Sequence, residues 1–171
     1  MTLDKLKRIK LLLLDVDGVL TDGSVIYHDT GAETKVFHIK DGLGIRMLMD
    51  AGIEVGIVTG RTSRALRHRC DNLGISLVFD QVRDKTGVLE VISKKRGVKA
   101  EHIAFVGDDL VDIPLMEKVG LSIAVADAHE IVVEHADMVT AAQGGAGAVR
   151  EVCEAILKAQ GLWEKVLARF R

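Results

Sequence analysis

Two aspartates stand close together at the end of an apolar run near the start of the chain. Asp15 and Asp17 close the run at residues 9–16, which has the length of a buried strand. In an open α/β sheet, ligands bind at the edge where such strands end. Two carboxylates this close repel each other, and a hard divalent cation such as Mg²⁺ relieves that repulsion. The pair alone is a weak signal, because aspartates also form turns.

A second acidic group follows another apolar run. Asp108, Asp109 and Asp112 come after residues 103–106, so we expect them at the same edge of the sheet. One of them is expected to cap the next helix, because Asp is a favoured N-cap residue. Capping does not explain acidic groups at the ends of two strands. Four or five carboxylates are therefore predicted to converge there.

Two more loops carry residues that suit a phosphate. Thr59, Gly60 and Arg61 offer a hydroxyl, an unhindered backbone amide and a guanidinium between an apolar run and a helix. Lys85 begins a later helix, where the favoured charge is negative, so a phosphate or carboxylate partner is one explanation for it. An ordinary surface lysine is the other, and for Lys85 alone it is the better one.

These loops need a scaffold in which strands and helices alternate. Helical spacing separates short apolar runs, which recur at residues 9–16, 53–58, 77–79, 103–106 and 121–125. Right-handed crossovers then give an α/β fold, a three-layer α/β/α sandwich with a doubly wound, mostly parallel sheet. One helix is predicted from its apolar face, which consists of Leu66, Cys70 and Leu73. Thr62 or Ser63 is expected to cap its start, and Gly74 to end it.

Two segments fall outside this alternation. Residues 25–28 and 35–38 read as the strands of a hairpin inserted after the first strand, with residues 29–34 as its turn. Its aromatic and β-branched residues favour pairing with copies from other subunits, and folding over its own sheet is the equally weighted alternative. Near the end of the chain, residues 144–147 are predicted to form a flexible hinge before a helix with apolar residues at Val149, Val152, Cys153, Ile156 and Leu157.

Composition limits the classes of protein that fit. The 171 residues carry 23 Lys and Arg against 25 Asp and Glu, a net charge of −2, which argues against a nucleic-acid binder. The 48% hydrophobic content supports one core, and we expect a single domain over residues 1–171. Only Cys70 and Cys153 are present, which fits a reduced protein. With no signal peptide or membrane span expected, we predict a cytoplasmic location.

The order Asp, Thr, Lys and Asp-Asp along four loops resembles that of the haloacid dehalogenase superfamily of phosphohydrolases. Longer segments are similar to the family of 3-deoxy-D-manno-octulosonate 8-phosphate phosphatases: DVDGVLTDG at 15–23, G-x-E-x-K-x-F at 31–37, DGLGI at 41–45, VTGR at 58–61, GDDLVDIPLM at 107–116 and GGAGAVREVCEAIL at 144–157. Asp80-Gln81 departs from the Gln-Gly pair usual in that family, which puts the local backbone shape and the exact sugar in doubt.

That family has no cap domain and is tetrameric. The resemblance implies a Mg²⁺-dependent phosphatase of lipopolysaccharide precursor synthesis, acting on a phosphorylated sugar acid as a homotetramer. It also implies that the hairpin, about residues 24–39, assembles the tetramer and helps to cover neighbouring active sites. The tail, about residues 161–171, is then able to fold over a site, although from the residues alone it is either a packed turn or a mobile end.

The resemblance also assigns roles to the chemical groups. Asp15 would attack phosphorus to give an aspartyl-phosphate, and Asp17 would serve as general acid and then as general base. Mg²⁺ would be held by the Asp15 carboxylate, the Asp17 backbone carbonyl and Asp108. Phosphoryl oxygens would meet Thr59, Gly60 and Lys85, while Asp109 or Asp112 would orient metal-bound waters or Lys85. Arg61, Arg64 and His68 fall on one predicted helical face that suits a sugar carboxylate. A solvated basic face is the equally weighted alternative for Arg64 and His68, and the resemblance favours Arg61.

Three alternatives stay open from the sequence. A nine-carbon sugar-acid 9-phosphate is the main rival substrate. A phosphoacceptor signalling domain also places acidic residues, a Thr or Ser and a Lys at strand ends, but normally takes its phosphorylated Asp from a middle strand. A non-catalytic tetramerisation module is the third, and the intact Asp15, Asp17, Thr59, Lys85 and Asp108 argue against it.

Overall fold

The computed structural model describes residues 2–171, which form a six-stranded parallel sheet and a separate two-stranded hairpin. The sheet order is β5-β4-β1-β6-β7-β8, and every neighbouring pair is parallel. The strands are β1 (Leu11–Leu14), β4 (Glu54–Val58), β5 (Leu77–Phe79), β6 (Ile103–Gly107), β7 (Leu121–Ala124) and β8 (Met138–Val139). Because the chain winds outward from β1 in both directions, the doubly wound sheet has its switch point beside β1, where ligands bind in such folds.

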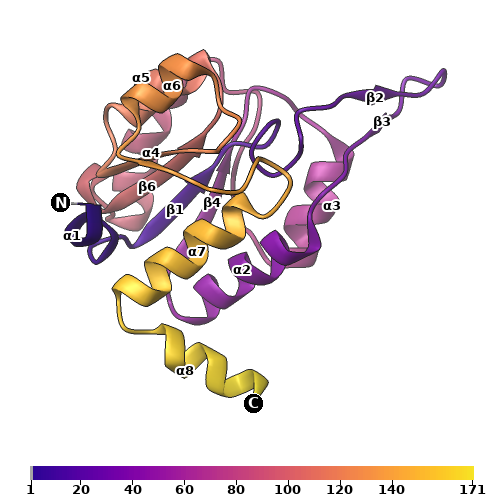
Figure 1. Ribbon diagram of the computed structural model, residues 1–171. Helices are drawn as coiled ribbons and strands as arrows, with labels where there is room; N and C mark the ends of the chain where they lie inside the picture. The colour runs from indigo at the N-terminus through magenta and orange to yellow at the C-terminus, as the bar shows by residue number, and fades with distance from the viewer. Residues whose placement is uncertain (1) are drawn as a thin grey trace.

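Helices cover both faces of the sheet, which gives the predicted three layers (Figure 1). Successive side chains of β1 point to opposite faces: Leu12 and Leu14 join one core cluster, Leu11 and Leu13 the other. The first cluster is covered by α1 (Thr2–Leu6), α2 (Ile39–Asp50), α3 (Arg64–Leu73), α7 (Ala148–Ala159) and α8 (Trp163–Leu167). The second is covered by α4 (Val88–Arg96), α5 (Ile113–Met116) and α6 (Glu130–His135).

Most expected elements are present with altered ends. The first strand, β1, is shorter than the apolar run at residues 9–16 that predicted it. Ile9 and Val16 are buried but lie outside the strand, so their apolar character reflects burial in the core and not strand pairing. Strand β8 was not predicted, since two residues carry too little pattern. The helix α3 begins after the N-cap Ser63 and ends at Gly74, whose φ of 81° is the left-handed conformation that glycine favours. Short 3₁₀ helices complete the connections, at Lys85–Gly87, Ala100–His102, Leu110–Asp112 and Ala168–Phe170.

The inserted hairpin exists, but its second strand was misplaced. Strand β2 (Ile26–Tyr27) pairs antiparallel with β3 (Glu33–Thr34), which the sequence analysis had assigned to the turn. The predicted strand at 35–38 is irregular backbone, because Lys35 turns back to contact the body of the protein. Figure 1 shows the hairpin projecting away from the sheet, so the alternative in which it folds over its own sheet is wrong.

The glycine-rich segment before α7 has a packing reason. A Cβ on Gly144 would lie 1.7 Å from the backbone oxygen of Gly18, and the Gly145 N–H donates to the Val19 carbonyl at 2.9 Å. Only glycine allows two backbones to approach so closely. The segment predicted as a hinge is therefore packed against the loop that follows β1, and it anchors α7 there.

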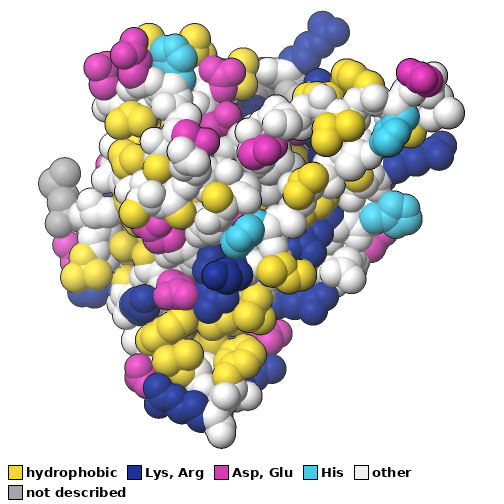
Figure 2. Space-filling model, turned by 45° about the vertical axis from the view of Figure 1, so that its right-hand side comes forward, with side chains coloured by type: hydrophobic (Ala, Val, Ile, Leu, Met, Phe, Trp, Pro, Cys, Tyr) yellow, Lys and Arg dark blue, Asp and Glu magenta, His cyan; other side chains and the backbone are white. Residues whose placement is uncertain are grey.

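The tail folds as α8 and packs on its own chain. Val166 is buried with the core cluster below α7, and Arg169 forms an ion pair with Asp50, the last residue of α2, at 2.8 Å. Figure 2 shows hydrophobic side chains on the surface at this lower end of the molecule. Of the two alternatives for the tail, a packed turn or a mobile end, the structure thus shows the packed one. No helix within residues 2–171 is long and apolar enough to cross a membrane.

Candidate active site

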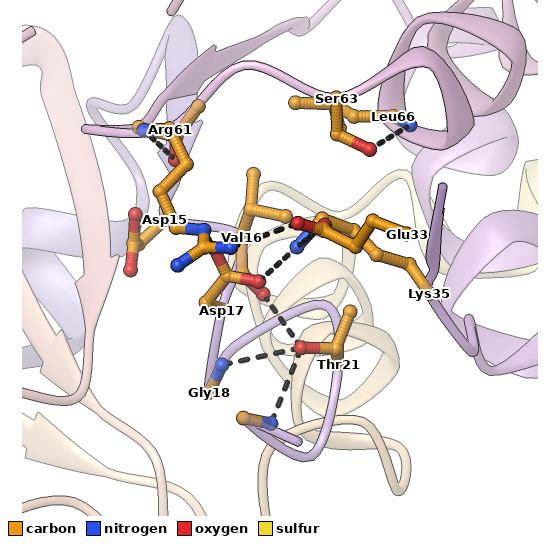
Figure 3. A network of polar contacts seen from close by, with 12 residues as sticks. Asp15, Val16, Asp17, Gly18, Thr21, Glu33, Lys35, Arg61, Ser63 and Leu66 are labelled. Carbon is orange, nitrogen blue, oxygen red and sulfur yellow. Dashed lines mark hydrogen bonds and ion pairs between the residues drawn. The ribbon is translucent and has the colours of Figure 1, made fainter. Parts of the chain in front are cut away.

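The loop after β1 is a tight turn held by one buried hydroxyl. The backbone N–H groups of Gly18 and Gly23 donate to Thr21 Oγ1 at 3.3 and 3.2 Å, and that hydroxyl donates to the Val16 carbonyl at 3.3 Å (Figure 3). Gly18 has a φ of 93°, and a Cβ there would lie 2.0 Å from Asp108 Oδ2. The turn therefore needs glycine both for its conformation and for the close approach of Asp108.

A buried lysine joins the loops of three strands. Lys85 Nζ lies 2.8 Å from Asp15 Oδ1 and 2.6 Å from Asp112 Oδ1, with the lysine side chain only 5% exposed. Lys85 occupies this position because Asp84 caps the short 3₁₀ helix by accepting the Thr86 N–H at 2.9 Å. The surface-lysine alternative is therefore wrong. We call Asp15, Lys85, Asp108 and Asp112 the acidic cluster.

The loop after β6 separates its three aspartates by role. Asp112 is fully buried and accepts the N–H groups of Asp108 and Asp109 at 2.9 and 3.3 Å on one oxygen, while Lys85 binds the other. Asp109 is exposed and caps the 3₁₀ helix that begins at Leu110, as expected for one member of this group. Asp108 Oδ1 is buried and has no hydrogen-bond partner.

The acidic cluster holds more negative than positive charge. Burial raises the pKa of Asp15 to about 6, against the attraction of Lys85, and burial together with repulsion by Asp15 and Asp112 raises the pKa of Asp108 to about 8. Burial lowers the pKa of Lys85, but the two flanking aspartates outweigh it, so the net shift is upward. The cluster is short of cationic charge.

This cluster fits a divalent cation. Oxygens of Asp15, Asp108 and Asp112 lie within 4.8 Å of one another. The oxygens of Asp112 are already occupied, which leaves Asp15 and the unpartnered Asp108 as the side chains able to bind a hard cation such as Mg²⁺. A bound cation would supply the missing positive charge and lower both raised pKa values.

The loop after β4 presents the predicted phosphate-binding groups. The Thr59 N–H donates to the Phe79 carbonyl at 2.9 Å, and the Val82 N–H donates to the Thr59 carbonyl at 3.0 Å, which fixes two loops together. Thr59 Oγ1 accepts the Arg61 N–H at 3.2 Å. Thr59 and Gly60 both line the same cavity as Asp15, so the structure brings them together as expected.

A second polar group surrounds Asp17. Lys35 forms an ion pair with Asp17 and another with Glu33 at 2.8 Å (Figure 3). Arg61 Nη2 donates to Glu33 at 2.8 Å and to the Tyr27 hydroxyl at 3.0 Å, and its Nε lies 3.6 Å from Asp17. These five residues, the hairpin network, tie the base of the hairpin to the loop after β1.

Sequence reasoning missed most of the hairpin network. Glu33 and Lys35 lie in the G-x-E-x-K-x-F segment, which carried a family resemblance but no role. Arg61 does not share a helical face with Arg64 and His68, because α3 begins only at Arg64. Instead its guanidinium turns toward the hairpin.

At the Asp80-Gln81 departure, Gln81 adopts a backbone conformation that glycine favours. Gln81 has a φ of 57°, and it is the one non-glycine residue with positive φ in the described chain. This is the conformation that the glycine usual at this position adopts without cost. Asp80 in turn accepts hydrogen bonds from Thr62 at 2.8 Å and Arg67 at 3.2 Å. Gln81 therefore takes this conformation with local backbone strain, while Asp80 ties the loop to the segment before α3 and to α3 itself.

All of these loops border one cavity of about 370 Å³. Its lining contains every predicted site residue except Asp112, which supports Lys85 from behind: Asp15, Asp17, Thr59, Gly60, Arg61, Val82, Arg83, Lys85, Asp108, Asp109 and Val111. Val82, Arg83 and Val111 were not predicted. The only signal in the sequence that could have found these three residues is that they lie close to Lys85 or Asp112 along the chain.

The fold and the site together define the class of protein. A doubly wound sheet with Asp, Thr, Lys and Asp-Asp at four strand ends is that of a haloacid dehalogenase-like hydrolase, and the family model of that description matches residues 77–152. The chain is 48% identical over 157 residues to the 3-deoxy-D-manno-octulosonate 8-phosphate phosphatase of Escherichia coli K12, covering 92% of this chain and 84% of that one. It belongs to the family of 3-deoxy-D-manno-octulosonate 8-phosphate phosphatases.

Solved structures agree with this assignment. The phosphatase of that name from Moraxella catarrhalis, crystallised with a magnesium ion, a phosphate ion and KDO, superposes with a TM-score of 0.97 at 42% identity over 99% of this chain and 98% of that one. The cobalt-bound enzyme from Haemophilus influenzae gives a TM-score of 0.91 at 44% identity over 96% and 99% of the two chains. Within residues 2–171 the structure is the α/β sandwich with the inserted hairpin.

Proposed function

We propose that this chain is a Mg²⁺-dependent phosphatase that hydrolyses 3-deoxy-D-manno-octulosonate 8-phosphate to the free sugar acid and phosphate, in lipopolysaccharide precursor synthesis. The observation that carries this proposal is the acidic cluster, in which Lys85 bridges Asp15 and Asp112 while Asp108 keeps a buried oxygen without a partner. The similarity to the Moraxella catarrhalis enzyme, which was crystallised with magnesium, phosphate and KDO, supports both the metal and the substrate.

Asp15 is the nucleophile in this proposal. One of its carboxylate oxygens forms a bond to phosphorus while the bond from phosphorus to the sugar oxygen breaks, which gives an aspartyl-phosphate. Lys85, fixed beside Asp15 by its second bond to Asp112, offsets negative charge on the transferring group. Thr59 and the Gly60 amide, both at the cavity wall, bind the phosphoryl oxygens.

Asp17 moves the protons. It gives a proton to the leaving sugar oxygen, then takes one from the water that attacks phosphorus and releases phosphate from Asp15. Lys35 and Arg61 hold its carboxylate at the cavity wall. Asp109, which is exposed and lines the same cavity, would orient water at the metal, while Asp112 orients Lys85.

Mg²⁺ would be held by the carboxylates of Asp15 and Asp108 and by the Asp17 backbone carbonyl. When bound, it neutralises charge on the phosphoryl group and keeps both carboxylates ionised. The raised pKa values of Asp15 and Asp108 support this assignment, because they mark a site that lacks positive charge.

We further propose a homotetramer assembled through the hairpin. The side chains of Val25, Ile26, Tyr27 and Val36 are 40%, 46%, 65% and 66% exposed on a projecting segment, which is unusual for apolar groups without a partner. Size-exclusion chromatography with light scattering tests this. Ile26→Asp with Tyr27→Asp should shift a tetrameric mass to that of a smaller species, whereas Leu3→Asp, at an exposed position away from the hairpin, should not.

Phosphate release from a panel of substrates tests the activity. The panel holds 3-deoxy-D-manno-octulosonate 8-phosphate, a nine-carbon sugar-acid 9-phosphate and hexose phosphates, each with and without Mg²⁺. The proposal requires a strong, Mg²⁺-dependent preference for the eight-carbon acid. Preference for the nine-carbon acid would keep the mechanism and change the substrate, and no release from any substrate would favour a binding module.

A further inference from the structure

The proposed substrate is anionic at both ends, so the cavity needs a second cationic partner besides the phosphate-binding groups. Three cationic side chains line the cavity: Arg61, Arg83 and Lys85. Lys85 is bound between two aspartates at the phosphate end. If the proposed function holds, the two arginines are the candidates that this chain's own cavity lining offers for the sugar carboxylate.

Arg61 is already neutralised within the protein. Its guanidinium binds Glu33 at 2.8 Å and the Tyr27 hydroxyl at 3.0 Å, and its Nε lies 3.6 Å from Asp17. A substrate carboxylate would have to displace at least one of these carboxylates, and would meet the negative charge of the others. The residue expected from sequence for this role is thus poorly placed to take it.

Arg83 is the unpaired cation of the cavity. Its side chain is exposed, and among the described residues it has no hydrogen-bond or ion-pair partner. Its backbone is nevertheless fixed, because the preceding Val82 donates to the Thr59 carbonyl and the following Asp84 caps the helix of Lys85. Arg83 is therefore a cavity-lining residue held two positions from the phosphate-binding lysine, and no partner within residues 2–171 neutralises its charge.

We propose that Arg83 binds the carboxylate of the sugar acid and so determines the preference for sugar-acid phosphates over neutral sugar phosphates. A planar guanidinium matches a carboxylate through two parallel hydrogen bonds, which a neutral hexose cannot accept in the same way. This inference rests on the proposed function and adds the residue that selects the substrate.

The experiment compares kcat/KM for 3-deoxy-D-manno-octulosonate 8-phosphate with kcat/KM for a hexose 6-phosphate. In Arg83→Ala the ratio of the two values should fall by about tenfold to a hundredfold, mainly through a higher KM for the acid, as expected for the loss of one charge-assisted pair. Arg83→Lys should retain part of the ratio. The control is Lys118→Ala, which removes an exposed cation near Asp84 that does not line this cavity, and its ratio should stay within about twofold of the wild type.

The outcomes separate the inference from the proposed function. If the wild-type protein shows no preference for the sugar acid, the proposed function fails first. If the wild type prefers the acid and Arg83→Ala keeps that preference, the assignment of Arg83 is overturned while the function stands. An equal loss in Lys118→Ala would also overturn it, because long-range charge would then explain the effect.

Discussion

The acidic cluster and the hairpin network adjoin each other at Asp15 and Asp17, yet they differ in charge balance. In the acidic cluster three carboxylates face the single ammonium of Lys85, and all four residues are buried except Asp108, which is half-buried. In the hairpin network two carboxylates face two cations, Lys35 and Arg61. The first group is incomplete without a further cation, whereas the second is satisfied by the protein itself.

This difference in charge balance distinguishes a group that can carry out chemistry from a group that positions other residues. Burying unbalanced charge costs stability, and such a cluster persists only where the fold enforces it. The acidic cluster is enforced by the ends of strands at the centre of the sheet. The hairpin network pairs the buried ammonium of Lys35 with the mostly buried carboxylates of Asp17 and Glu33, so its charges balance. Its role is to hold Asp17 beside Asp15.

The largest expected effect is on turnover in Asp15→Asn. The change removes the nucleophile while keeping the size of the side chain, so phosphate release should fall by about 10⁴-fold or more. Asp22→Asn, in the same loop but exposed and bonded only to the Ser24 N–H, should stay near wild type. A folded Asp15→Asn protein with near-normal turnover would remove the basis for treating the acidic cluster as the chemical site.

Lys85→Met tests the charge imbalance through stability. With Lys85 gone, three carboxylates lose their only internal cation, and the free energy of unfolding of the metal-free protein should fall by about 3 kcal/mol. Uptake of protons by Asp15 and Asp108 limits the loss. Lys94→Met, which breaks an exposed pair with Glu90, should cost less than about 0.5 kcal/mol in the same urea titration.

A matching change in the hairpin network sharpens the contrast. In Lys35→Met, Asp17 and Glu33 retain Arg61 as a partner, so the loss should be clearly smaller than in Lys85→Met. Equal losses in the two variants would show that the balance of charge does not distinguish the two groups.

The response to Mg²⁺ should depend on pH. The folded pKa values of Asp15 and Asp108, about 6 and about 8, lie above the ordinary value of 3.8. Between about pH 4 and pH 8 the metal-free folded protein thus holds protons that the unfolded chain has lost, so its stability falls as pH rises. Since the cation binds the ionised carboxylates, the increase in Tm that Mg²⁺ produces should grow from pH 6 to pH 8.5. An increase of the same size at both pH values in thermal unfolding scans would contradict this, and Asp108→Asn should flatten the dependence.

The smallest expected effect concerns Gln81, in the loop that leads to Lys85. Gln81→Gly removes the strain of a positive φ but gives the unfolded chain more freedom, so the protein should gain at most about 1 kcal/mol in urea unfolding. Gln81→Ala, which keeps the strain, should not gain. A loss of stability in Gln81→Gly would show that the Gln81 side chain contributes contacts that outweigh its backbone conformation.

Much of the fold was predictable because its signals are local. Short apolar runs marked β1, β4, β5, β6 and β7, and the cap at Ser63 and Gly74 marked α3. Since parallel strands end at one edge, the order Asp15, Thr59, Lys85 and Asp108 was enough to predict one site. The errors fell where the pattern is short, at β8 and in the second strand of the hairpin.

The sequence by itself thus determined the sheet, the edge where the site lies and the chemical groups that meet there, because periodicity and strand-end position are properties of neighbouring residues. Only the tertiary structure decided how the charges pair. It buried Asp112 behind Lys85 and left Asp109 exposed, bound Arg61 to Glu33, and left Arg83 free. These pairings join segments that meet only when the sheet has formed, and burial, which no local pattern records, sets their electrostatic energy.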